Sequence, residues 1–155
     1  MDDKVKNGNN RLKILYLYKI FLDKTDEHHY LTMSDIVNQL KLYGISAGRK
    51  ALYEDIEALK AYGLDIITIK GRVSAYYVAS RDFELPELKL LADAVSSSRF
   101  LTEKKSSELL KKIENLSSVH EAKQIQRQVY VTNRVKAMNE RIYLSLIHIS
   151  EPTRR

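Results

Sequence analysis

Two glycines bracket the stretch that most constrains the fold of this chain. Between Gly44 and Gly63 the sequence reads ISAGRKALYEDIEALKAY, in which Leu52, Ile56 and Leu59 recur at i, i+4 and i+7. This spacing places the three apolar side chains on one face of a helix, and glycine commonly ends helices. The stretch therefore predicts one amphipathic helix, separated by a very short turn at Gly44 from the element before it.

That preceding element is also predicted to be a helix. Thr32 and Asp35 have the spacing of a capping box, in its aspartate variant, and apolar residues follow at helical spacing up to Gly44. Further upstream, an apolar pattern over residues 10–23 predicts a first helix that Asn10 can cap. Three helices are thus expected before Gly63.

A β-hairpin is predicted directly after the third helix. The runs DIITIK and SAYYVA are rich in β-branched and aromatic residues, and they are joined around Gly71 and Arg72. Three helices followed by a hairpin are the element order of a winged helix-turn-helix. We assign it to residues 1–80 and expect a fold that is mainly α with a small β-hairpin.

The second half of the chain is predicted to be helical. Pro86 is placed to open one helix, Thr102 can cap another, and Ser118 with Glu121 forms a capping box that opens a further short helix. The apolar residues predicted for the first two of these helices are Leu88, Leu91, Ala92 and Val95, then Leu109, Leu110, Ile113 and Leu116. Residues 81–143 therefore form a helical connector.

The outer face of the third helix carries the chemistry of a nucleic-acid contact. Arg49, Lys50 and Tyr53 lie on the first two turns, opposite the apolar face. Arginine can hold guanine bidentately, lysine neutralises phosphate, and a tyrosine hydroxyl can bond phosphate while its ring packs on sugar or a thymine methyl. In a winged helix the hairpin tip, here with Lys70 and Arg72, lies beside the DNA backbone or minor groove.

The complete predicted DNA-binding set also includes two serines at helix starts. Ser46 is placed to cap the third helix, and Ser34 lies at the start of the second. The predicted site residues are Ser34, Ser46, Arg49, Lys50, Tyr53, Lys70 and Arg72. No catalytic residue, metal ligand or cofactor is predicted.

Composition favours a polyanionic partner but does not locate it. The chain has 26 Lys+Arg, 20 Asp+Glu and a formal charge of +6. Residues 99–141 contribute ten Lys/Arg and five Glu, whereas residues 1–80 contribute twelve Lys/Arg and ten Asp/Glu. The basic excess is therefore concentrated outside the predicted DNA-binding segment.

Other features of the sequence bear on the cellular location of the protein. The chain contains no cysteine, which excludes disulfides and thiolate metal sites. The first apolar stretch, ILYLYKIFL, is interrupted by Lys19 and falls far short of a membrane span. We expect a cytoplasmic protein that has neither a signal peptide nor a membrane-spanning helix.

Several segments of the sequence closely resemble one bacterial protein family. GISAGRKALYEDIEALKAYGLDI, GRVSAYYV, RDFELPELKLLADAVSSSRFLTEKKSSELLKKIENL and RQVYVTNRVKAMNERIY resemble the N-terminal part of the WYL-domain transcriptional regulators of Gram-positive bacteria. The resemblance covers residues 12–143. It implies a DNA-binding winged helix, whose recognition helix carries Arg49, Lys50 and Tyr53, then a helical connector and an effector-sensing WYL barrel. It further implies homodimers that read paired half-sites about one helical turn apart.

The sequence departs from that family in two places. Gly48 stands where the family has a helix former, and glycine in a first helical turn costs up to about 1 kcal/mol relative to alanine. After Tyr143 the chain reads LSLIHISEPTRR in place of the WYL barrel, and this segment resembles a translated sequencing adapter. We therefore expect residues 144–155 to be a non-native tail and the effector site to be absent.

The sequence also bears on two other classes of function. An enzyme is not supported, because no P-loop, G-x-S-x-G or H-E-x-x-H spacing occurs and the four histidines include only one adjacent pair, His28 and His29. A protein-interaction module is the stronger alternative, since winged helices can bind proteins and the Leu109 to Leu116 row could form a dimer seam. Internal packing of that row against the preceding helix is the expectation we favour.

Overall fold

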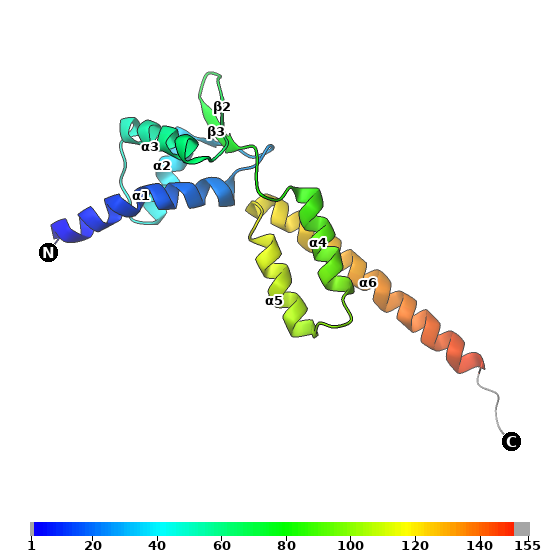
Figure 1. The fold of residues 1–155 in the computed structure, drawn as a ribbon. Coiled ribbons are helices and arrows are strands. Elements are labelled where there is room, and N and C mark those ends of the chain that lie inside the picture. Colours follow the sequence, from blue (N-terminus) through cyan, green and yellow to red (C-terminus); the bar gives the residue numbers. More distant parts are fainter. Residues whose placement is uncertain (1, 151–155) are drawn as a thin grey trace.

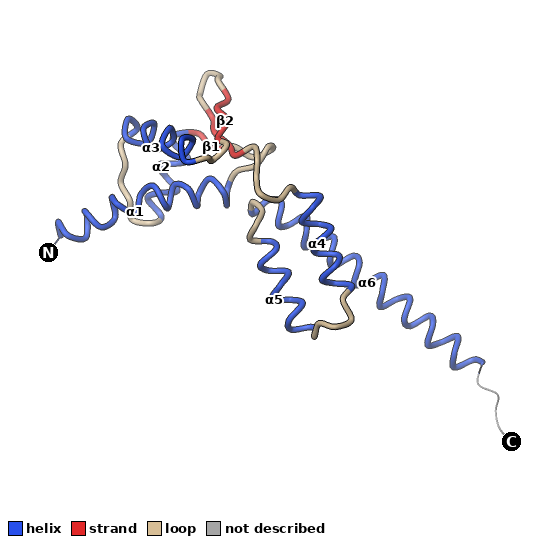
Figure 2. The backbone as a smooth tube through the Cα atoms, in the orientation of Figure 1, coloured by secondary structure: helices blue, strands red, loops and turns tan. Residues whose placement is uncertain are grey.

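The computed structural model describes residues 2–150 of the chain (Figure 1). The fold is mainly helical with one small antiparallel sheet, which confirms the predicted class at that level (Figure 2). In order, the elements are α1 (Asp2–Lys24), β1 (Leu31–Thr32), α2 (Met33–Leu42), α3 (Arg49–Tyr62), β2 (Ile66–Ile69), β3 (Ala75–Val78), α4 (Leu85–Ser97), α5 (Glu103–Glu114) and α6 (Val119–Ser150).

The sheet contains the predicted hairpin and one strand that was not predicted. Strands β2 and β3 pair in antiparallel register from Ile66 opposite Val78 to Ile69 opposite Ala75. The short strand β1 adds to the other edge of β3, which gives the order β1-β3-β2. A strand of two residues is too short to produce an alternating pattern, so the sequence predicted only the Thr32 cap there.

One hydrophobic core joins α1, α2, α3 and the sheet, which together we call the amino-terminal unit. Its fully buried side chains come from every helix of the unit and from β3: Leu17, Ile20, Phe21, Ile36, Leu40, Leu52, Ile56 and Val78. The predicted apolar faces of the second and third helices are confirmed, including Leu59 at 4% exposure. Burial of this face fixes how α3 is rotated about its axis.

Both bracketing glycines end their helices as predicted. Gly44 (φ 72°) and Gly63 (φ 119°) are in left-handed conformations, which side chains disfavour. After each glycine the next N–H reaches back to the helix, from Ile45 to the Leu40 carbonyl and from Leu64 to the Leu59 carbonyl. This is the Schellman arrangement, with an apolar contact closing it.

The start of α3 differs from the prediction. Ser46 does not cap the helix, because α3 begins at Arg49 and its N-cap is Gly48 (φ −77°, ψ 150°). Because Ile45 is buried against α2, residues 46–48 are needed to span the distance to the start of α3. The Gly48 carbonyl then accepts the first helical hydrogen bond, from the Leu52 N–H. Glycine at the N-cap costs only a few tenths of a kcal/mol relative to serine, less than in a first helical turn.

A second, smaller core joins α4, α5 and α6, which we call the helical unit. Leu88, Ala92 and Ile125 are buried, and four partly buried residues pack on them: Leu85, Leu110, Ile113 and Val129. The capping box of Ser118 and Glu121 and the cap of Thr102 are confirmed. Two predicted core leucines are instead exposed, Leu91 at 39% and Leu116 at 47%.

Two helices are longer than predicted. Helix α1 begins at Asp2 rather than Asn10. Helix α6 is not short, since it extends through the start of the predicted tail to Ser150, and Figure 1 shows it running away from the amino-terminal unit. Residues 151–155 of that tail lie outside the described residues. Over residues 2–150, no helix is both long and apolar enough to cross a bilayer.

Candidate nucleic-acid interface

The two basic residues at the start of α3 are exposed and unpaired. Arg49 and Lys50 occupy the first turn, and the described side chains include no ion-pair or hydrogen-bond partner for either. The other described lysine of this helix, Lys60, is instead paired with Glu57 at 2.8 Å. Both cationic groups of the first turn are thus available to an external anion.

The backbone N–H groups at the start of α3 have no side-chain cap and no acidic neighbour in the first turn. The first N–H groups of a helix lack intrahelical partners, and the helix dipole adds a partial positive charge there. Placing arginine and lysine at such an end opposes helix stability but favours a phosphate or another anion.

The opposite side of α3 is fixed to α1. Asp55 lies 2.8 Å from the Lys13 ammonium, and their side chains are only 19% and 16% exposed. The predicted structural salt-bridge role of Asp55 is confirmed. Together with the buried Leu52 and Ile56, this pair holds the charged first turn outward.

Tyr53 has a partner that its sequence position did not reveal. Its side chain lies close to the Tyr76 hydroxyl of β3, although 49% of the Tyr53 residue surface is exposed. Burial, followed by the nearby Tyr53 and Glu57, raises the pKa of Tyr76. The side chain predicted to contact phosphate therefore also lies next to the sheet. The irregular burial of AYYV gave no alternation from which to predict this role for Tyr76.

The sheet also brings the start of α2 close to the hairpin loop. In β1, Leu31 pairs with Tyr76 and Thr32 pairs with Ala75, the first residue of β3 after the loop. Thr32 is the N-cap of α2, so Ser34 in the first turn begins beside the base of the hairpin. The front of α3 and the start of α2 thus converge on the same strand.

The basic residues at the hairpin tip are exposed as predicted. Lys70 and Arg72 lie between β2 and β3, and neither has an ion-pair partner among the described side chains. Figure 1 shows α3 and the hairpin on the same side of α1, with the tip projecting furthest. Ser46 is exposed in the turn between α2 and α3. All seven predicted residues are therefore on the surface, distributed over α2, the turn, α3 and the hairpin.

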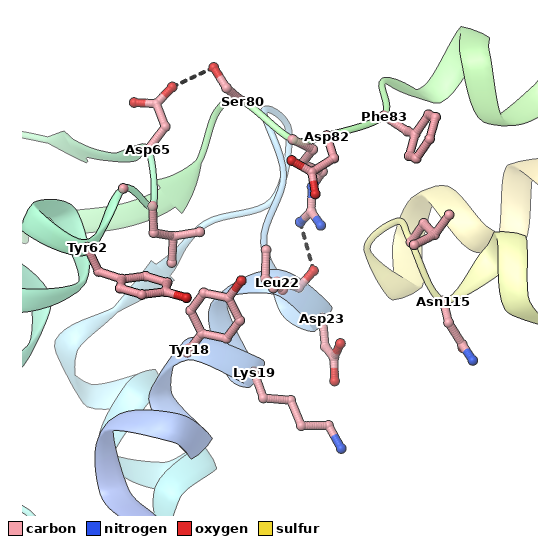
Figure 3. A pocket seen from close by; sticks show the side chains of 14 residues that line it. Tyr18, Lys19, Leu22, Asp23, Tyr62, Asp65, Ser80, Asp82, Phe83 and Asn115 are labelled. Atoms are coloured by element: carbon pink, nitrogen blue, oxygen red, sulfur yellow. Dashed lines mark hydrogen bonds between the residues drawn. The ribbon is translucent and has the colours of Figure 1, made fainter.

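A cleft lies away from these residues, where the two units meet. It has a volume of about 700 Å³ and is bordered by α1, the end of α3, the segment after β3 and the turn before α6 (Figure 3). Arg81 crosses it and donates to the carbonyls of Leu22 and Thr25 at 2.7 and 2.5 Å, capping the end of α1. Burial lowers the pKa of this arginine. A single arginine after a strand gave no sequence signal for this role.

The described residues contain no group of three or more His, Cys, Asp and Glu side chains arranged to hold a metal ion. Comparisons with protein-family models, curated proteins and solved structures returned no match to this chain.

Proposed function

We propose that this protein is a transcriptional regulator that binds double-stranded DNA with sequence specificity. In this proposal the amino-terminal unit is a winged helix-turn-helix, α3 is its recognition helix and the hairpin is its wing. The observation that supports it most strongly is the first turn of α3, where Arg49 and Lys50 are exposed, unpaired and next to uncapped N–H groups, while the back of the helix is fixed.

Each contact has a chemical role in this proposal. Arg49 reads a base edge in the major groove, and Lys50 neutralises a neighbouring phosphate. Tyr53 offers its half-exposed ring to sugar or a thymine methyl. Lys70 and Arg72 on the wing contact the backbone or the minor groove.

The remaining residues of the proposed interface act at the DNA backbone. Ser34, in the first turn of α2, and Ser46, in the turn before α3, offer exposed hydroxyls to phosphate oxygens. Acidic side chains limit the rest of α3, because Glu54 and Glu57 are exposed further along the helix. Only the front end of α3 therefore enters the groove.

The resemblance to the WYL-domain regulators supports the same proposal independently of the geometry. It implies that α4, α5 and α6 form a connector, and the proposal includes a location in the bacterial cytoplasm. The packing of the partly buried Leu110 and Ile113 on the core of the helical unit agrees with an internal structural role for α5.

A binding selection from random duplex DNA tests the proposal. The wild-type chain should enrich a defined motif, and Arg49→Ala should cost about 1 to 3 kcal/mol on that motif but much less on random DNA. Lys111→Ala, an exposed lysine of α5, is the matched control and should keep the preference for the motif. The absence of any retarded complex in a gel shift, even in dilute buffer, would contradict the proposal.

Association with another protein chain is a second candidate function, favoured by one observation on α6. Four apolar residues spaced by four, three and four positions are more than half exposed: Val131 58%, Val135 51%, Met138 56% and Ile142 56%. This is the spacing of a coiled-coil seam. The structure thus favours α6 over the Leu109 to Leu116 row for such contacts. Sedimentation of the wild type against Val135→Asp measures whether the seam forms a homodimer.

A further inference from the structure

The contact between the two units is built around one buried carboxylate. Asp26, in the loop after α1, is 4% exposed, and Ser118 at the start of α6 is fully buried. The Ser118 hydroxyl donates to Asp26 Oδ2 at 2.5 Å while accepting the Glu121 N–H at 3.1 Å. One serine side chain therefore caps α6 and ties it to the loop of the amino-terminal unit.

A stacked pair of histidines lies on the same contact. The rings of His29 and His120 are nearly parallel, with an interplanar angle of 5° and a centroid separation of 3.7 Å. His29 Nδ1 lies 2.7 Å from Asp26 Oδ1, whereas His120 lies beside the backbone of Lys24. A proton on His29 is thus matched by a carboxylate. A second proton, on His120, would put two like charges face to face.

Of the charged groups around the pair, Asp26 favours a proton on His120 but does not outweigh burial and His29. Lys123 of α6 adds a positive charge near His120, and Glu121 lies close to Arg81. The carboxylates of Glu27 and Glu84 border a neighbouring pocket of about 370 Å³ together with His28 and His29. This pocket gives solvent protons access to the contact.

We infer that Asp26, His29, Ser118 and His120 form a proton-sensitive latch, which holds the two units together at neutral pH and releases them in mild acid. Apart from this contact and Arg81, the cleft of Figure 3 separates the units over one side. Loss of the latch therefore frees the helical unit to change its angle to the amino-terminal unit. The latch acts between the two units whether or not the protein binds DNA.

The direction of the response follows from the energetics of His120. Burial and the adjacent His29 lower its pKa, so the closed form resists protonation that the open form accepts at the ordinary histidine pKa of about 6.5. Between pH about 8 and pH about 5.5 the ratio of open to closed molecules should rise by up to about tenfold. Above pH about 7.5 the ratio should be constant.

Distance measurements between spin labels on the full chain test the latch. The chain has no cysteine, so Asn38→Cys on α2 and Ser107→Cys on α5 provide single label sites in the two units. The wild-type background should show one distance population at pH about 8 and a growing second population toward pH about 5.5. His120→Phe, which keeps an aromatic ring but cannot be protonated, should retain the first population throughout.

Two further variants separate the latch from general acid sensitivity. His28→Gln changes the neighbouring histidine, which is not part of the stack, and should respond to pH like the wild type. Ser118→Ala should show the second population already at pH about 8, because Asp26 loses its donor across the contact. An unchanged distance distribution in the wild-type background across this range, or an equal response in His120→Phe, would overturn the inference.

Discussion

Lys13 of α1 and Asp55 of α3 form an ion pair at 2.8 Å with less than a fifth of either side chain exposed. The pair lies beside the apolar back of α3 and fixes the helix against α1. The contribution of this pair to stability depends on both partners, because removing one leaves a largely buried charge without a counter-ion.

We therefore predict that Asp55→Ala lowers the free energy of unfolding by about 1 to 3 kcal/mol. Glu54→Ala, the neighbouring exposed carboxylate, is the control and should change it by less than about 0.5 kcal/mol. Urea denaturation followed by circular dichroism measures both. Equal effects of the two substitutions would show that the pair does not hold α3 in place.

Gly63 should be the glycine least tolerant of a side chain. Its φ of 119° is strained for any L-residue, although no atom lies within 4 Å of where a Cβ would stand. Gly63→Ala should therefore cost about 1 to 2 kcal/mol through the backbone alone. Gly71→Ala, where a Cβ would meet only the Val73 carbonyl at an ordinary 3.7 Å, should be nearly neutral in the same thermal unfolding assay. A neutral Gly63→Ala would contradict this account of the end of α3.

Asp26 should make stability depend on pH. Burial alone would raise its pKa, but the hydrogen bonds from Ser118, His29 and the His28 N–H, with the charge of His29, outweigh burial and lower it from 3.8. The Asp26 carboxylate therefore binds a proton more readily in the unfolded chain than in the folded protein. The stabilisation of the fold by ionised Asp26 is complete at pH values above the unfolded pKa. It is lost as pH falls through the lower folded pKa.

The measurement is the difference in unfolding free energy between wild type and Asp26→Asn at several pH values. This difference should be largest near neutral pH and should shrink as pH falls below about 4. Asp82→Asn, an exposed carboxylate in the segment after β3, is the matched control. A difference that stays constant down to acid pH would show that the charge of Asp26 is not stabilised by its neighbours.

The helix start at Gly48 allows a test that separates stability from binding. A Cβ there meets nothing within 4 Å, so either Gly48→Ser or Gly48→Asp can cap α3 and should stabilise the fold by a few tenths of a kcal/mol. Only the aspartate adds a negative charge beside the proposed phosphate. Gly48→Asp should therefore weaken DNA binding at low salt, while Gly48→Ser should not. Equal affinities in a fluorescence anisotropy titration would remove this helix end from the interface.

Local patterns predicted much of the amino-terminal unit. Gly44, Gly63 and the Thr32 cap act through bonds to residues at most five positions away, so their roles can be inferred from spacing. The true start of α3 was missed because burial of Ile45, a tertiary effect, decides where the turn ends. Spacing on one helix therefore identifies its faces more reliably than its first residue.

The contacts that orient the elements could not be predicted, because they join distant parts of the chain. Ser118 and Asp26 are 92 positions apart, and each residue also fits an ordinary local role in a cap or a turn. The same applies to Tyr53, whose neighbour Tyr76 lies on a strand without regular alternation. The sequence thus predicted which residues of the candidate interface are exposed but not what supports them.

The salt dependence of binding to duplex DNA tests the central claim most directly. Plotted as log affinity against log salt concentration, the wild-type slope should be steep, and Lys50→Ala should reduce its magnitude by about 0.9, the contribution of one phosphate contact. Lys112→Ala, an exposed lysine on α5, should leave the slope unchanged. A slope that Lys50→Ala does not alter would contradict the placement of α3 at the DNA.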